Sequence, residues 1–371
     1  MKVALLVTDL GLTGTPKYVE LLALALPTVG EVQTEVICYQ PPLDRLNALE
    51  AQGIYVHVLF PEGSRHSRGE CIRRLRKLLN AIKPDCVHTN LWKYNLVTSW
   101  VLYSLRIPEV TTWHYYMGKI DFLNGNILKH PPTDLLAAHF QQVAGAHFIA
   151  IGDHIRRPGI LKHNITTIFT GVPIQDKIQK TDVLPIVLFE AARMIPAKGQ
   201  EDLLRAITLL TPRDNFEVWF AGDGPQKLAL EKLSQELSLS NVRFLGWRPD
   251  VQELFQQADI AVLPSHSGEG LPIFIIEAMM YSLPVVGYNI PPLQALVTEG
   301  CGILVDVGDI VGLSAALARL LSDSELRVSM GEAAHRRAVE YFSDMAFARN
   351  VLAVYRKALP GKAYSPRMLN K

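Results

Sequence analysis

The sequence predicts an α/β protein with two doubly wound, Rossmann-like domains. Short apolar runs rich in valine and isoleucine alternate with amphipathic stretches, which is typical of parallel sheets covered by helices on both faces. A length of 371 residues is enough for two domains, each with a core of its own. The polar segment 171–185, which holds prolines near both ends, separates two series of such runs and is expected to be a linker.

The expected strands follow these apolar runs in order. The first series predicts strands at 3–7, 35–39, 55–59, 86–88, 110–114, 147–151 and 166–169. The second series predicts strands at 186–189, 217–221, 242–245, 260–263, 284–287 and 303–305. Ligands of doubly wound sheets bind beyond the carboxyl ends of the strands, so two facing domains would form one deep cleft.

Composition excludes several classes of protein. A hydrophobic share of 49%, a charged share of 20% and a net charge of +1 describe a globular protein with no bias toward nucleic acid. The four cysteines have no paired spacing, so neither a zinc site nor a disulfide framework is expected, and a reducing cytoplasm fits best. Asp9 ends the first apolar run too early for a signal peptide. The run 96–105 is far shorter than the roughly 20 residues of a membrane span, so any membrane association would be peripheral.

Two glutamates flank an expected helix start after the strand 260–263. Glu269 precedes the helix, Pro272 stands at its entrance, and Glu277 lies about one turn further in. The uncapped amides of a first helical turn attract phosphate, and a carboxylate can accept hydrogen bonds from vicinal hydroxyls such as those of a ribose. The alternative is that both glutamates only complement the helix dipole.

Two cations lie in the strand-to-helix turn that follows 186–189. Arg193 and Lys198 together favour an anion such as a diphosphate, whose oxygens become more negative when a sugar–phosphate bond breaks. This pair could therefore assist the departure of the leaving group. The alternative is that both are solvated loop charges.

At this point the order of motifs resembles the retaining glycosyltransferases of the GT-B fold, in the family 4-like and group 1 class. The resemblance runs through the turn with Arg193 and Lys198 and continues through AGDGP, NVRFLGWRPDV, ADIAVLPS, EGLPIFIIEAM, LPVVG and GILV, the last at 302–305. It implies an acceptor-binding domain at 1–174 plus about 352–371, and a nucleotide-sugar-binding domain at 175–351. A last helix at about 345–358 would pack on the first domain.

The resemblance also implies roles for individual residues. The donor diphosphate would be held by Arg193 and Lys198, the ribose by Glu277, and the donor sugar by Glu269 with the amides of Gly270 and Leu271. The base would meet the turn at Trp247 and Arg248, and Gly222 and Gly224 would keep the backbone close to the nucleotide, although tight turns explain these two glycines equally well. His114 matches a histidine beside the reacting sugar, with a structural role at a strand end as the alternative, and His88 at a comparable strand end is a weaker candidate. The expected catalytic residues are His114, Glu269, Arg193 and Lys198.

The first domain departs from the family pattern and leaves the acceptor open. Relatives usually show paired glycines in the first loop, where this chain has Gly11 and Gly14, so Gly14 and Thr15 are weaker candidates for donor contacts. Aromatic residues near strand ends, among them Trp92, Tyr94 and Tyr115, suit a glycan or lipid-linked acceptor, and core packing is the alternative. The basic segment 65–83 could rest on an anionic membrane at its inner face, and a solvated basic face is the alternative.

The expected activity is transfer of a sugar from a nucleotide sugar, with UDP favoured, to a hydroxyl acceptor in bacterial-type glycan or glycolipid synthesis. Such enzymes retain the anomeric configuration, and the absence of an Asp-x-Asp string predicts that neither a metal nor a cofactor is needed. A nicotinamide oxidoreductase is disfavoured because the Gly-x-Gly-x-x-Gly spacing is missing. A sugar-nucleotide epimerase or hydrolase, or a non-catalytic binding protein on the same fold, stays open. The oligomeric state is not predicted.

Overall fold

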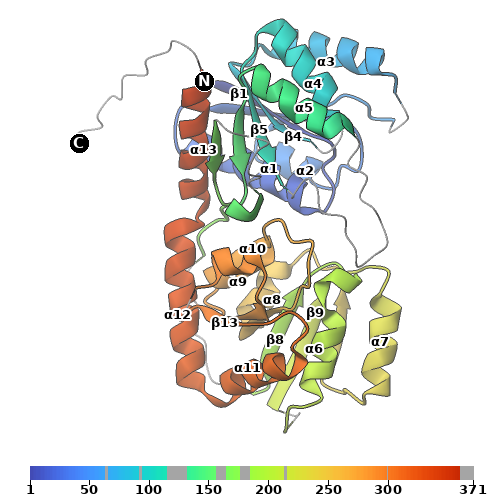
Figure 1. The fold of residues 1–371 in the computed structure, drawn as a ribbon, viewed down its shortest axis with the longest axis vertical. Coiled ribbons are helices and arrows are strands. Elements are labelled where there is room, and N and C mark those ends of the chain that lie inside the picture. The colour runs from blue at the N-terminus through green and yellow to red at the C-terminus, as the bar shows by residue number, and fades with distance from the viewer. Residues whose placement is uncertain are drawn as a thin grey trace, which may run out of the picture. The chain divides into compact units, whose positions relative to one another are not determined.

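The computed structural model describes residues 1–62, 66–91, 94–114, 132–155, 164–175, 184–212, 215–298 and 300–359. Two compact units make up the chain. The second unit is Phe169–Ala346, and the first consists of the described residues up to Ile168 together with those from Phe347 onward. Figure 1 shows the fold of both. The predicted domain boundaries at 174 and about 352 concern where independently folding domains end, and they stay a prediction.

The first unit is built on a parallel sheet with the strand order β3-β2-β1-β4-β5-β6-β7. Its strands are β1 (Lys2–Val7), β2 (Gln33–Cys38), β3 (Tyr55–Val58), β4 (Cys86–Asn90), β5 (Glu109–Trp113), β6 (His147–Ala150) and β7 (Ile165–Thr167). Its helices are α1 (Gly14–Ala25), η1 (Leu26–Thr28), α2 (Leu46–Ala51), α3 (Arg68–Ile82), α4 (Asn95–Leu105), α5 (Pro132–Val143), η2 (Asp153–Ile155) and most of α13 (Asp344–Ala358).

Side-chain alternation along the strands divides the core of this unit into two layers. Ala4 and Leu6 of β1 pack in one cluster with Leu75 of α3 and Val101 of α4. The opposite face carries α1 and α13, where Phe347 of α13 packs edge-on against a tyrosine of α1 at 5.0 Å between ring centroids. Both faces are therefore covered, which explains why the strands are apolar runs rather than alternating ones.

The second unit is built on a parallel sheet with the order β10-β9-β8-β11-β12-β13. Its strands are β8 (Ile186–Ala191), β9 (Phe216–Ala221), β10 (Val242–Gly246), β11 (Ile260–Leu263), β12 (Val285–Tyr288) and β13 (Gly302–Val305). Its helices are η3 (Pro196–Lys198), α6 (Gln200–Ile207), α7 (Lys227–Glu236), α8 (Val251–Gln257), α9 (Ile273–Met280), α10 (Pro291–Leu296), α11 (Ile310–Ser322) and α12 (Ser324–Tyr341).

Successive residues of β8 again serve opposite layers. Leu188 joins a buried cluster with Leu203 of α6 and Leu317 of α11. Phe189 faces the other way, where its ring lies 5.3 Å from Phe255 of α8 and 5.6 Å from a phenylalanine of α9. The burial of both layers anchors the amino end of each loop that leaves the carboxyl edge of this sheet.

The structure confirms the predicted α/β fold. Each predicted strand overlaps an observed one, and the predicted last helix corresponds to α13, which packs on the first unit from Phe347 onward. The four cysteines are free and buried. Among the described residues, no helix has the length and apolar character needed to cross a bilayer. The predicted linker lies partly outside the described residues.

Candidate functional site

The sheet of the second unit has a switch point between β8 and β11. The chain continues from β8 to β9 on one side and from β11 to β12 on the other, so the loops that leave β8 and β11 diverge. In open parallel sheets such a divergence at the carboxyl edge is where ligands bind. The predicted cations follow β8 and the predicted carboxylates follow β11, so the topology brings the two motifs to one place.

Lys198 and Glu269 form an ion pair at this switch point. Lys198 Nζ lies 2.5 Å from Glu269 Oε1, and the two side chains are 19% and 7% exposed. The same carboxylate oxygen accepts a hydrogen bond of 2.6 Å from Ser265 Oγ. Because both groups are largely shielded from water, their Coulomb attraction is stronger than that of a surface salt bridge, and removing either partner would leave an uncompensated shielded charge.

Gly199 is what lets the two loops approach so closely. Its φ is +75°, in the left-handed region, and a Cβ at this position would overlap the carbonyl oxygen of Pro264 in the β11 loop. The contact is reinforced by the amide of His266, which donates to the carbonyl oxygen of Ala197 at 2.9 Å. Glycine is therefore required here for two reasons, backbone conformation and space.

A second polar cluster supports the β11 loop from α6. Asp202 Oδ2 accepts a hydrogen bond of 2.6 Å from the Tyr288 hydroxyl and lies 2.7 Å from His266 Nε2. Sequence reasoning missed this cluster, and also Ser265 and Gly199. The lysine–glycine step before an amphipathic helix was a signal for Gly199. No local pattern joins Asp202 to residues more than 60 positions away.

Arg193 is exposed on the same loop as Lys198. The neighbouring loops are tied to this one by backbone hydrogen bonds, including that from the Met194 amide to the Asp223 carbonyl at 2.9 Å. A Cβ at Gly222 would overlap the carbonyl oxygen of Ala192, and one at Gly224 would overlap that of Met194. Close packing of the β8 and β9 loops is thus enough to require both glycines, and their contact with a nucleotide stays a prediction.

The turn after β10 presents an exposed aromatic side chain. Trp247 is 55% exposed, whereas the guanidinium of Arg248 is held by both carboxylate oxygens of Asp250, at 2.7 Å and 2.5 Å. This local ion pair keeps the pKa of Asp250 below its ordinary value. Trp247 is therefore free to stack on a planar ligand, while Arg248 is already engaged within its own turn.

The helix α9 begins beside Glu269. Pro272 is its N-cap residue, and its side chain makes no capping hydrogen bond. Gly270 and Leu271 precede it, and the partly buried Glu277 is on the first turns of the helix itself. The predicted order of carboxylate, amides and carboxylate around a helix start is thus present in the structure, as is the lack of a donor at Pro272.

In the first unit, His114 lies at the carboxyl edge of the sheet. Its Nε2 is 2.9 Å from Asn90 Oδ1 at the end of β4, so the ring donates there and has its Nδ1 lone pair left to accept. The ring also packs edge-on against Tyr18 of α1, at 4.6 Å. Burial lowers the pKa of His114 to about 3, so the imidazole is neutral at physiological pH.

The remaining candidates of the first unit differ in how far the structure explains them. His88 has a structural place, since its nitrogens lie 2.6 Å from the Tyr355 hydroxyl and 2.6 Å from Thr112 Oγ1 in the core. Tyr94 stacks on Tyr39 at 4.6 Å and donates to Gln40. Gly14 is exposed at the start of α1, with open space around it, and Thr15 follows it. Trp92 and Tyr115 lie outside the described residues.

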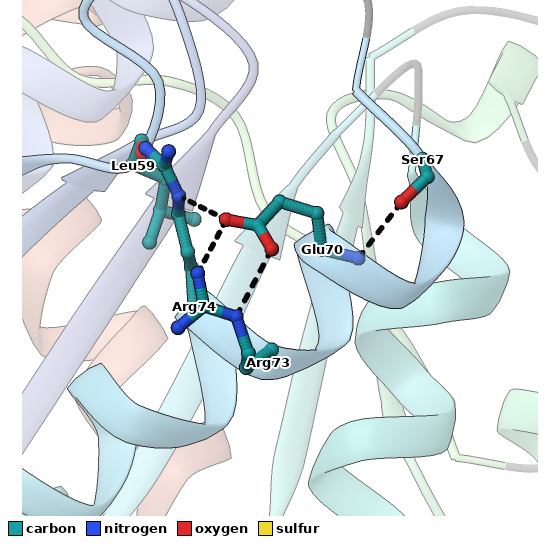
Figure 2. Close-up of polar contacts among 5 residues, drawn as sticks. All are labelled: Leu59, Ser67, Glu70, Arg73 and Arg74. Carbon is teal, nitrogen blue, oxygen red and sulfur yellow. Dashed lines mark hydrogen bonds and ion pairs between the residues drawn. The ribbon is translucent and has the colours of Figure 1, made fainter.

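The basic segment forms α3, and part of its charge is neutralised locally (Figure 2). Glu70 accepts bonds from Arg73 at 2.6 and 3.0 Å and from Arg74 at 2.7 Å, while its own amide is capped by Ser67. The Arg74 guanidinium also donates to the carbonyl oxygen of Leu59. Hydrogen bonds from the two arginines hold the pKa of Glu70 at about 2. The exposed basic residues of the helix and its C-cap include Arg68, Lys77 and Lys83, and Arg65 lies outside the described part.

Each unit thus has a parallel sheet with a switch point, and in the second unit a basic loop leaves that point. Residues 173–337 match the family model of glycosyl transferases group 1, and residues 13–151 match that of the glycosyl transferase 4-like domain. The chain is 32% identical over 306 residues to a D-inositol 3-phosphate glycosyltransferase of Corynebacterium glutamicum, which covers 74% of this chain and 72% of the relative. The chain therefore belongs to the group 1 glycosyltransferase family.

Other relatives match over part of their length. The lipopolysaccharide core biosynthesis glycosyltransferase LpsE of Rhizobium meliloti is 31% identical over 159 residues, 42% of this chain and 46% of the relative. An exopolysaccharide phosphotransferase of Streptomyces coelicolor is 31% identical over 170 residues, 45% of this chain and 17% of the relative. The chain thus spans less than half the length of these two relatives.

Solved structures share the whole fold at low identity. HepE of Anabaena, in complex with UDP and glucose, aligns with a TM-score of 0.80 at 20% identity over 96% of this chain and all of its own. Sucrose-phosphate synthase of Thermosynechococcus elongatus aligns with a TM-score of 0.77 at 20% identity, over 96% of this chain and 98% of its own. The fold of this chain is GT-B.

Proposed function

We propose that this protein is a retaining glycosyltransferase that moves a sugar from a nucleotide sugar, with UDP favoured, to a hydroxyl acceptor in bacterial-type glycan or glycolipid synthesis. The observation that carries the proposal is the shielded pair of Lys198 and Glu269 at the switch point of the second unit. Family membership supports the reaction class, and the relatives named for lipopolysaccharide core biosynthesis support the pathway class. HepE, which was solved with UDP, supports the choice of base.

The donor diphosphate would bind between Lys198 and Arg193. An ammonium has three N–H donors, and Glu269 uses one of those of Lys198, so two are left for phosphate oxygens. The exposed guanidinium of Arg193 adds a second cation on the same loop. Charge-assisted bonds of this kind strengthen as the leaving group becomes more negative, and they therefore lower the barrier to bond cleavage.

The rest of the donor would extend along the carboxyl edge of the sheet. Glu269 and the amides of Gly270 and Leu271 would hold the hydroxyls of the sugar, and Glu277 those of the ribose. Trp247 would stack on the base, because its indole is exposed after β10, two strands from β8 at the same edge of the sheet. The weaker candidates Gly222, Gly224, Arg248, Gly14 and Thr15 would line the nucleotide or phosphate.

In the proposed reaction, the acceptor hydroxyl attacks the anomeric carbon from the face that the phosphate leaves. The bond from carbon to phosphate oxygen breaks, the bond to the acceptor oxygen forms, and the hydroxyl proton passes to the departing phosphate. No protein nucleophile takes part, so the protein contributes positioning and charge stabilisation. His114, being neutral, would orient a sugar hydroxyl through its Nδ1 lone pair. We propose that no metal or cofactor is needed, and full activity in EDTA is the expected result.

Thermal shift with UDP-, GDP- and ADP-sugars tests the donor. A ligand present at 100 times its dissociation constant stabilises the fold by roughly 2.7 kcal/mol, so the correct base should stand out. Release of the free nucleotide is then measured with and without glycan or lipid-linked acceptors. Release that depends on an acceptor supports transfer, whereas equal release without one indicates a hydrolase. Binding without any turnover indicates a sugar-nucleotide binding protein.

We also propose that the α3 face contacts an anionic membrane and so meets a lipid-linked acceptor. The helix α3 packs against α4, which carries two exposed aromatic residues, Trp100 and Tyr103. Arg76 joins the two helices, because its guanidinium bonds Ser104 Oγ at 2.8 Å and lies over the Trp100 ring. Aromatic and basic side chains together suit a headgroup layer. Flotation with phosphatidylglycerol vesicles at low salt is the test, and no binding would rule the contact out.

A further inference from the structure

Two buried polar side chains bracket the loop that carries the cations. Glu190 is on β8 just before the loop, and Gln200 is the first residue of α6 just after it. They are 1% and 2% exposed. Gln200 Nε2 donates to Glu190 Oε1 at 2.8 Å and also reaches the carbonyl oxygen of Arg193 at 3.5 Å. The contact therefore joins the two ends of the loop 191–199.

This contact leaves one oxygen on each side without a partner. In the part of the chain that the structure describes, neither Glu190 Oε2 nor Gln200 Oε1 has a hydrogen-bond partner. If Glu190 were a carboxylate, Glu190 Oε2 and Gln200 Oε1 would both be acceptors, and no hydrogen bond could form between them. If Glu190 carries a proton on Oε2, that oxygen becomes a donor for Gln200 Oε1. The acid and the amide would then exchange two hydrogen bonds in one ring, which would satisfy both unpartnered atoms.

The surroundings of Glu190 favour the protonated form. Burial raises the pKa of its carboxyl well above the ordinary value, and the nearby charge of Glu269 acts in the same direction. The charge of Lys198, whose effect is larger than that of Glu269, and the hydrogen bond from Gln200 act in the opposite direction, but burial outweighs both. The groups that face Glu190 are thus Lys198 from η3, Glu269 from the loop after β11 and the neutral amide of Gln200 from α6.

We infer that Glu190 and Gln200 form a protonated carboxyl–amide clasp that joins the two ends of the loop 191–199 and keeps a second negative charge away from Lys198. The clasp makes Glu190 a positioning residue, and this role rests on the proposed function of the loop in binding a diphosphate. An ionised Glu190 would lose its bond to Gln200 Oε1. It would also offer Lys198 a second carboxylate, in competition with the phosphate, and cancel the net charge of +1 that Arg193, Lys198 and Glu269 together present.

Infrared difference spectroscopy tests the proton directly. The spectrum of the wild-type chain minus that of Glu190→Gln isolates this carboxyl from other buried acids such as Glu109. We expect the carbonyl band of a protonated acid at pH 7, and its conversion to carboxylate bands at alkaline pH. A difference spectrum with only carboxylate bands at pH 7 would overturn the clasp.

UDP binding, measured by calorimetry across pH, tests the positioning role. Wild-type affinity should fall over the pH range in which the acid band disappears, whereas Glu190→Gln, whose amide pairs with Gln200 at any pH, should hold affinity within about threefold over that range. Gln200→Leu breaks the clasp and should weaken UDP binding about tenfold or more. The exchanged double variant Glu190→Gln/Gln200→Glu should recover it.

Two results separate the inference from the proposed function. If the wild-type chain binds no UDP at any pH, the proposed function fails, and the infrared band still decides the clasp. If Glu190→Gln is folded and shows the same alkaline loss of UDP affinity as the wild type, the positioning role is wrong even where UDP binds. Thermal unfolding of each variant at pH 7 establishes that it is folded before affinities are compared.

Discussion

Replacing Lys198 with alanine tests the diphosphate site most directly. In the structure, Lys198 has one N–H directed at Glu269 and two left for phosphate oxygens. Each charge-assisted bond contributes about 1.5–3 kcal/mol, so the loss of one predicts a fall of about tenfold, and the loss of both a fall of about a hundredfold or more. The variant also leaves the shielded Glu269 carboxylate without its cation beside a second anion.

The assay compares nucleotide release and UDP affinity in Lys198→Ala with those of the wild type, after thermal unfolding has shown that the fold is intact. Arg205→Ala is a matched control, because Arg205 is also a basic residue in an ion pair, at 2.8 Å from Glu201, but both side chains are about half exposed. We expect this control to change neither the rate of nucleotide release nor the UDP affinity by an amount equivalent to more than about 1 kcal/mol. A second variant, Lys198→Ala/Glu269→Gln, removes the unpaired charge and should recover part of the UDP affinity. Wild-type turnover and affinity in folded Lys198→Ala would refute the assignment.

Three further predictions concern stability and pH. Gly199→Ala should lower the free energy of unfolding, measured in urea, by more than about 2 kcal/mol, because it adds a clash with Pro264 to the strain of a left-handed φ. Gly308→Ala, at φ +82° in open space, should lower the free energy of unfolding by only about 1 kcal/mol, and equal losses in the two variants would contradict the packing argument. Burial raises the pKa of Glu109 from 4.5 to about 7, so the folded state binds this proton more tightly, and the stability that it provides is lost as pH rises from 4.5 to 7. The difference in free energy of unfolding between wild type and Glu109→Gln should therefore change by about 3 kcal/mol over that range, and a constant difference would argue against the shift. Because the pKa of His114 is about 3, we expect no fall of turnover near pH 6.5 that vanishes in His114→Gln; such a fall would mean that the imidazole titrates normally.

The strands were predictable because both sheets are parallel and covered on two faces. Residues such as Leu188 and Phe189 face opposite layers and are both buried, so the whole strand is a continuous apolar run in the sequence. The motifs after β8 and β11 were equally visible, and the topology explains why they meet. Their roles toward a donor stay predictions.

What the sequence did not indicate depends on contacts between distant residues. Glu190 ends an apolar strand and Gln200 begins a helix, where polar residues are common and give no sign of burial or pairing. Asp202 and Tyr288 meet across 86 positions. In the same way, the packing of Tyr94 on Tyr39 distinguishes a stacked core residue from a surface platform, and sequence spacing alone cannot do this.

The buried cysteines make this chain convenient for site-specific labelling. All four thiols are inaccessible, and burial raises the pKa of Cys38 to about 12 and that of Cys86 further still, so little reactive thiolate is present at neutral pH. A cysteine introduced at an exposed position would therefore be the main site of attachment for a maleimide dye. One fluorophore on each unit would then report, by energy transfer, whether the spacing of the two units responds to a nucleotide.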